Sequence, residues 1–206
     1  MSYMSALEKV TADIERMYSQ FRIRPISDIA DRLPWNHFLE MGLVIAHRDF
    51  DKILSEKEWA IVSGRGPSGP LHLGHLLVFK FVAWLQNTFN VYAFIPLSDD
   101  EKLVFGKIDS LERACHWALD NARWIAALGF DHHKTRIYIS SQHSWVYRYA
   151  ITIARHLTIS AVKGALGVED SKNIGIPFYA AVQITHILQP TLDFGLRTVV
   201  PIVLDQ

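Results

Sequence analysis

Two histidines lie three positions apart in the most chemically informative segment of the sequence. That segment is Gly64-Arg65-Gly66-Pro67-Ser68-Gly69-Pro70-Leu71-His72-Leu73-Gly74-His75. Histidines at this spacing near the start of a helix lie on one face, so both rings can reach one ligand. Imidazole N–H groups and the backbone N–H groups of a helix start donate hydrogen bonds to anions, including polyphosphates. The pair therefore indicates a nucleotide-phosphate site.

The residues around the two histidines are those that a phosphate-binding loop requires. Gly64 and Gly66 let the chain turn tightly, and Gly74 removes a side chain where a flat base approaches the backbone. The Arg65 guanidinium suits a phosphate or a carboxylate. We expect an ATP cradle made of Gly64, Arg65, Gly66, Pro67, Ser68, His72, Gly74 and His75. A bare His-x-x-His pair can also be a surface feature or part of a metal site, so its place in the fold matters.

The elements on either side of this segment can be predicted from their patterns. The apolar run at residues 59–62 predicts a strand, which ends at the glycine- and proline-rich loop. From Leu73 the apolar residues recur at three and four positions, which predicts a helix that packs on a sheet and ends at Asn90. In open α/β sheets, such a strand-to-helix junction is where nucleotides bind.

The remaining elements alternate between strands and helices. Apolar runs predict strands at residues 91–97, 136–140 and 198–204, and helical patterns cover 110–128, about 143–165 and about 178–188. Continuous apolar strands separated by helices form parallel sheets that are covered on both faces. We therefore predict an α/β fold, a Rossmann-like doubly wound domain over residues 58–206. Residues 1–57 are expected to form an N-terminal extension, with an amphipathic helix near residues 6–21.

Composition excludes several classes of protein. The 21 Lys and Arg residues balance 21 Asp and Glu residues, so no overall positive field favours nucleic acid and any RNA contact would be local. The single cysteine excludes an internal disulfide, and the N-terminus does not resemble a signal peptide. The apolar stretch at residues 76–85 contains Lys80 and is too short to span a bilayer. We expect a cytoplasmic protein without a membrane partner.

The segment with the two histidines resembles the HIGH motif of class I aminoacyl-tRNA synthetases, with His72, Gly74 and His75 at matching positions. The preceding Gly-Arg-Gly-Pro-Ser stretch resembles the tryptophanyl branch of archaea and eukaryotes. Three further stretches match that branch in order: residues 36–49, Asp99-Asp100-Glu101-Lys102 and Leu204-Asp205-Gln206. The resemblance runs from about residue 30 to the last residue.

The resemblance implies a ligase that activates an amino acid, tryptophan in this branch, with ATP and transfers it to tRNA. The carboxylate of the amino acid attacks the α-phosphorus, so positioning and charge stabilisation matter more than proton transfer. His72 and His75 would be the catalytic residues, because their hydrogen bonds stabilise charge on the phosphate oxygens. Mg²⁺ would arrive with ATP, and a homodimer is possible.

The resemblance also implies an amino-acid pocket formed by Val62, Pro96, Glu101, Gln183 and Gln206. Val62 stands where related enzymes carry a tyrosine, and Pro96 stands where they carry a glutamine. These exchanges remove polar groups that distinguish an indole from other side chains. A rebuilt pocket, another substrate such as tyrosine, and a paralogue that has lost ligation all remain open. A small nucleotidylyltransferase with the same His-x-Gly-His segment is a further alternative.

Two features are absent from the sequence. The other histidines lack the ligand spacing of a structural zinc site, so we expect no resident metal and assign His116, His132, His133 and His143 to packing or to the surface. Nothing in residues 1–206 resembles the lysine-rich KMSKS loop or an anticodon-binding domain of these synthetases. We therefore expect a fragment, a truncated form or a degenerate paralogue, with weak catalysis by these residues alone.

Overall fold

The computed structural model describes residues 22–169 and 171–202, which divide between Lys57 and Glu58 into two compact units. The helix predicted near residues 6–21 lies outside the described residues. The first unit has a two-stranded antiparallel sheet and short helical turns, with Ile29 and Phe50 buried. In chain order its elements are β1 (Arg24–Pro25), η1 (Ile26–Arg32), α2 (His37–Glu40), β2 (Ala46–His47) and α3 (Phe50–Ile53).

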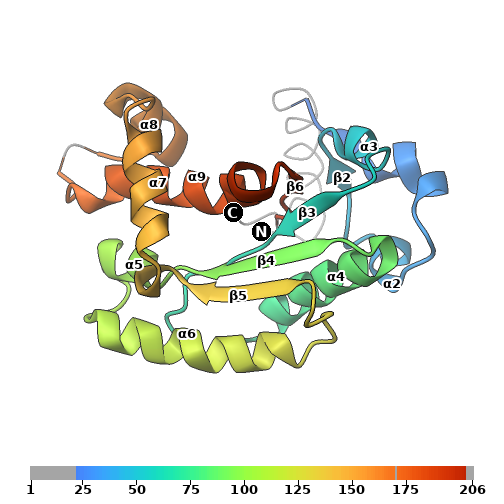
Figure 1. Ribbon diagram of the computed structural model, residues 1–206, viewed down its shortest axis with the longest axis horizontal. Coiled ribbons are helices and arrows are strands. Elements are labelled where there is room, and N and C mark those ends of the chain that lie inside the picture. Colours follow the sequence, from blue (N-terminus) through green and yellow to red (C-terminus); the bar gives the residue numbers. More distant parts are fainter. Residues whose placement is uncertain (1–21, 170, 203–206) are drawn as a thin grey trace, which may run out of the picture. The chain divides into compact units, whose positions relative to one another are not determined.

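The second unit contains a four-stranded parallel sheet. Its strands are β3 (Trp59–Val62), β4 (Tyr92–Leu97), β5 (Thr135–Ile139) and β6 (Arg197–Val199), in the order β5-β4-β3-β6 (Figure 1). The sheet confirms the predicted parallel arrangement. The last strand is shorter than predicted, because Pro201 lacks the N–H that a strand ladder needs. Residues 203 and 204 lie outside the described part.

Over the described residues of this unit, six α-helices connect the strands: α4 (Leu73–Phe89), α5 (Asp99–Val104), α6 (Leu111–Ala126), α7 (Ser144–Ala154), α8 (Ile159–Leu166) and α9 (Gly175–Phe194). The single helix predicted at about 143–165 is wrong. The Thr158 side chain accepts a hydrogen bond from Ala161 N–H at 3.2 Å and so begins a separate helix. The helix predicted at about 178–188 begins three residues earlier and ends six residues later, as α9.

The predicted ends of α4 and the start of α6 are confirmed. Asn90 ends α4 in the left-handed conformation, with φ of 55°. Ser110 Oγ accepts a hydrogen bond from Arg113 N–H at 3.2 Å at the start of α6. These boundaries are set by local chemistry, which explains why the sequence reveals them.

Helices cover both faces of the sheet, as Figure 1 shows for α4 and α6 on one side and α7 and α9 on the other. Side chains alternate along each strand between these faces. Ile95 and Leu97 of β4 pack with Phe79 of α4 and with α6. Phe94 packs on the opposite face with β3, and Tyr138 of β5 packs there with α7 and α9. The predicted doubly wound Rossmann-like fold is therefore confirmed.

Two neighbouring carboxylates hold the start of α5 in place. Asp99 is fully buried and accepts hydrogen bonds from the backbone N–H of Ser141, at 3.0 Å, and from its hydroxyl. Asp100 accepts a hydrogen bond from Tyr147 Oη at 2.9 Å. Burial raises the pKa of Asp100 to about 6, although the Tyr147 bond acts in the opposite direction. The segment 99–101 is thus the first turn of a helix tied to η2 (Ser140–Gln142) and to α7.

The raised pKa of Asp100 predicts how stability depends on pH. Because its pKa is about 6 when folded and 3.8 ordinarily, the folded protein binds more protons between pH 4 and pH 6, and stability falls as pH rises through this window. Asp100→Asn removes this ionisation and can still pair with Tyr147. We expect the unfolding free energy of the variant relative to wild type to rise by up to about 3 kcal/mol across the window and then level off.

Urea denaturation between pH 4 and pH 8 measures this difference. Asp109→Asn removes an exposed carboxylate that pairs with Arg113, and it serves as the matched control. A difference between Asp100→Asn and wild type that stays constant over the whole range would contradict the prediction.

Candidate active site

The loop after β3 continues alongside β4 for two residues. Ser63 N–H donates to Phe94 O at 3.1 Å, and Arg65 N–H donates to Pro96 O at 3.0 Å. Ser98 N–H then donates to Arg65 O at 2.9 Å. This ladder carries Arg65 to the carboxyl end of β4, the edge of a parallel sheet where ligands bind.

Gly64 is required because Pro96 approaches it closely. A Cβ on Gly64 would lie 2.6 Å from both Pro96 Cγ and the Pro96 carbonyl oxygen. In the regular ladder, the N–H of residue 96 would donate to the Ser63 carbonyl, and proline has no N–H. A proline within an inner strand is unusual, and here it lies at the edge of the candidate site.

The two predicted catalytic histidines lie together at the start of α4. His72 is the N-cap residue in extended conformation, and its ring centroid lies 3.6 Å from that of His75. A Cβ on Gly74 would come within 3.2 Å of His72 Cε1, so glycine leaves room for this ring. The 17-residue helix behind them directs the positive end of its dipole toward the loop.

Arg65 contacts this histidine pair directly. Its Nη1 lies 2.8 Å from His75 Nδ1, and His72 N–H lies 3.3 Å from the same nitrogen. A guanidinium only donates hydrogen bonds, so Nδ1 of His75 accepts and the ring proton lies on Nε2. Burial lowers the pKa of Arg65, while the charge of Glu101 opposes this effect. The arrangement gathers several hydrogen-bond donors around one point.

The first turn of α5 packs against the loop at Gly66. A Cβ on Gly66 would lie 2.2 Å from Glu101 Oε2 and 2.4 Å from Lys102 Cε. Lys102 Nζ pairs with Glu101 Oε1 at 2.7 Å. The predicted amino-acid contact Glu101 thus lies against the predicted phosphate loop, with a lysine that we did not single out beside it.

Helix α9 contributes Tyr179, which sequence reasoning missed. Burial raises the pKa of its hydroxyl, and the nearby charge of Glu101 acts in the same direction. Phe105 packs edge-on against the Tyr179 ring, with centroids 5.8 Å apart. The amphipathic pattern of α9 alone would place this tyrosine in the core.

The other predicted residues take different positions. Val62 and Pro96 are buried, and Val62 packs with Phe94 on the face of the sheet that α9 covers. Gln183 is exposed on α9, and Gln206 lies outside the described residues. In the loop, Pro67 is buried, whereas Ser68 is exposed and lines a shallow depression with Lys107 and Arg113.

Asn121 is a further residue that the sequence analysis did not identify. It is fully buried on α6, and its Nδ2 donates to Gly69 O at 3.0 Å. The amide therefore fixes Gly69, which directly follows the predicted phosphate loop. An asparagine on the otherwise apolar face of α6 was the available signal.

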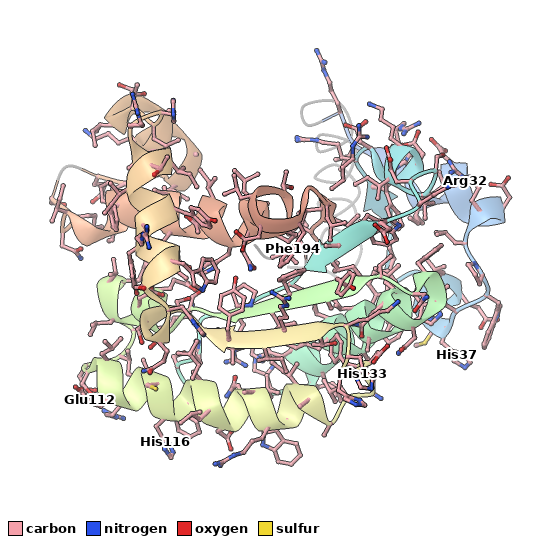
Figure 2. All side chains as sticks on the ribbon, viewed as in Figure 1. Arg32, His37, Glu112, His116, His133 and Phe194 are labelled. Carbon is pink, nitrogen blue, oxygen red and sulfur yellow. The ribbon has the colours of Figure 1, made fainter. Side chains whose placement is uncertain are left out.

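Several histidines lie away from this site. His116 and Glu112 are on the side of α6 that faces away from the sheet, and His133 lies in the turn before β5 (Figure 2). Within residues 22–169 and 171–202, no three His, Cys, Asp or Glu residues are grouped so that they could hold a metal ion. Over the same ranges, no helix is long and apolar enough to cross a membrane.

Comparison with known proteins places this geometry in a family. The model of tRNA synthetases class I (W and Y) matches residues 54–194. The tryptophan–tRNA ligase of Pyrococcus abyssi is 37% identical over 173 residues, which is 82% of this chain and 44% of that protein. That of Pyrobaculum calidifontis is 35% identical over 207 residues, or 94% of this chain and 55% of that protein.

Solved structures agree with these relatives. The tryptophanyl-tRNA synthetase of Encephalitozoon cuniculi bound to tryptophan has a TM-score of 0.85 at 28% identity, over 94% of this chain and 58% of that one. The Giardia lamblia enzyme has a TM-score of 0.80 at 33% identity, over 90% of this chain and 50% of that one. The chain spans about half the length of the relatives it matches. It belongs to the class I tRNA synthetases of the tryptophan and tyrosine group, and the relatives described here are tryptophan enzymes.

Proposed function

We propose that the protein is a tryptophan–tRNA ligase, which activates tryptophan with ATP to the aminoacyl-adenylate and transfers it to tRNA. The observation that carries this proposal is the cluster of Arg65, His72 and His75 where β3 leads into α4. The tryptophan–tRNA ligases among its relatives support the choice of amino acid. We propose that residues 58–206 form the catalytic domain and that residues 1–57 extend it.

The phosphates of ATP would lie over the loop 64–68 and the start of α4. His72, His75 and Arg65 would donate hydrogen bonds to the phosphate oxygens as charge moves to the leaving pyrophosphate. Because Arg65 donates to His75 Nδ1, the ring proton of His75 lies on Nε2, from which it can be donated to a phosphate oxygen. Mg²⁺ would be bound by the phosphates of ATP, because this ion is commonly held by substrate phosphates and only one or two carboxylates.

The amino acid would lie beside the phosphates, over the carboxyl ends of β3 and β4. Glu101 supplies a carboxylate for the amino group at this edge, and Val62 and Pro96 form an apolar wall. Gln183 and Gln206 remain candidates for contacts with the substrate. An apolar wall suits the rings of both tryptophan and tyrosine, so tyrosine is the competing substrate to test. A homodimer remains a prediction.

Amino-acid-dependent exchange of pyrophosphate into ATP tests this function. The full-length gene product should catalyse exchange with tryptophan in preference to the other nineteen amino acids. His72→Ala and His75→Ala should each lower kcat by about 100-fold or more, because each removes a donor that stabilises the transition state. Exchange that depends on no amino acid would rule out the proposal, and exchange that prefers tyrosine would correct the substrate.

The packing at Gly66 gives a sharper test with a matched control. Gly66→Ala places a methyl group where the ends of the Glu101 and Lys102 side chains lie, so it should displace the Glu101 carboxylate and weaken binding of tryptophan by about tenfold. Gly69→Ala lies in the same loop but meets no atom within 4 Å. Calorimetry with ATP and tryptophan should show binding by the Gly69 variant close to that of wild type. Equal losses in the two variants would contradict the proposed packing of Glu101 on the loop.

A further inference from the structure

A histidine with no part in the proposed reaction is buried between α9 and the end of β5. His186 Nδ1 lies 3.1 Å from Tyr138 Oη, and His186 Nε2 lies 3.0 Å from Ser140 Oγ. The side chains of all three residues are buried. Both ring nitrogens of His186 are therefore joined to hydroxyls at the carboxyl end of β5.

The burial of this group favours a neutral imidazole. A neutral ring has one donor and one acceptor, and each hydroxyl can take the complementary part, so all the groups are satisfied without a charge. An imidazolium would place a charge among buried apolar side chains, and burial lowers the pKa of His186 to about 4. Two further titratable groups face Tyr138: His143, whose ring centroid lies 5.8 Å from that of Tyr138, and Asp193, whose charge acts on the Tyr138 hydroxyl.

The same group lies next to the proposed amino-acid pocket. Tyr138 is paired in register with Pro96, one of the two residues of the apolar wall. His186 follows Gln183 by three residues on α9, and positions three apart are neighbours on a helix surface. If the His186 side chain moved toward or away from the sheet, α9 would shift with it, and Gln183 would change its position relative to the carboxyl ends of β4 and β5.

We propose that His186 is a positioning residue for the amino acid: by linking Tyr138 and Ser140 through its ring, it holds α9, which carries Gln183, at a fixed place beside the carboxyl end of β5. This inference rests on the proposed function. In this proposal, His186 itself does not contact the substrate. It predicts that the loss of these hydrogen bonds affects binding of the amino acid and leaves binding of ATP to the loop 64–68 unchanged.

Three substitutions separate the positioning role from a general loss of stability. His186→Phe fills the space but leaves both hydroxyls unpaired. His186→Gln retains one donor and one acceptor on a planar amide, so it can rejoin Tyr138 and Ser140. Ile125→Val trims a fully buried side chain on the opposite face of the sheet and is the control for destabilisation alone.

Pyrophosphate exchange should give the following pattern. His186→Phe raises KM for the amino acid by about tenfold and leaves KM for ATP within about twofold, since the displacement is local to α9. His186→Gln restores most of the amino-acid KM, and Ile125→Val changes neither KM. An active His186→Phe protein with an unchanged amino-acid KM, or with equal changes in both KM values, would overturn the inference and leave the proposed function intact.

A readout that does not depend on activity tests the hydrogen bonds themselves. In ¹⁵N-labelled wild-type protein, the His186 ring should show a single neutral tautomer throughout the neutral pH range, and Tyr138→Phe should alter its nitrogen shifts. A ring that exchanges between tautomers as histidines do in free peptides would overturn the inference. Absence of exchange activity in wild type would contradict the proposed function and this inference with it.

Discussion

The close approach of residues 63–65 to β4 determines the rest of the candidate site. Three backbone hydrogen bonds hold these residues beside Phe94, Pro96 and Ser98. The approach is possible only because residue 64 has no side chain, since any Cβ there would overlap the Pro96 ring and its carbonyl oxygen. With the backbone fixed in this way, the Arg65 side chain reaches His75 at the start of α4. The position of the donors thus follows from the contact of one glycine with one proline.

A second set of contacts places the acidic and basic groups against this loop. Asp99 is buried and Asp100 is partly buried, and they are bonded to Ser141 and Tyr147, which come from η2 and α7. A carboxylate is costly to bury unless it is hydrogen-bonded, and both of these have hydroxyl partners. The cost is visible in the raised pKa of Asp100. These hydrogen bonds fix the start of α5, and as a result Glu101 and Lys102 lie against Gly66.

The parts of this structure that the sequence predicts are those governed by local chemistry. Strand β3, helix α4 and the cap at Ser110 depend on residues within a few positions, and the histidine pair depends on helix geometry. The helix α5 was not predicted, because the partners of Asp99 and Asp100 lie 42 and 47 positions away. Asn121 was missed for the same reason, since Gly69 lies 52 positions before it. Long-range pairing of polar side chains leaves no periodic pattern in a sequence.

The polar side chains buried on each face of the sheet bear on the proposed choice of amino acid. The side with α4 and α6 contains aliphatic and aromatic side chains around Ile95 and Leu97, and its buried amides, Gln86 and Asn121, bond to Thr135 and to Gly69. The side with α9 contains buried polar groups, among them Tyr138, Ser140 and His186, close to the wall of Val62 and Pro96. An apolar wall discriminates by shape, which is worth only about 1–3 kcal/mol per methylene, whereas a hydrogen-bonding site rejects a wrong substrate far more strongly. If Val62 and Pro96 form the wall of the amino-acid pocket, as proposed, they supply no side-chain hydrogen bond to the substrate. Strong discrimination between an indole and a phenol would then depend on polar groups such as those on the α9 side, whose position depends on how that helix is held.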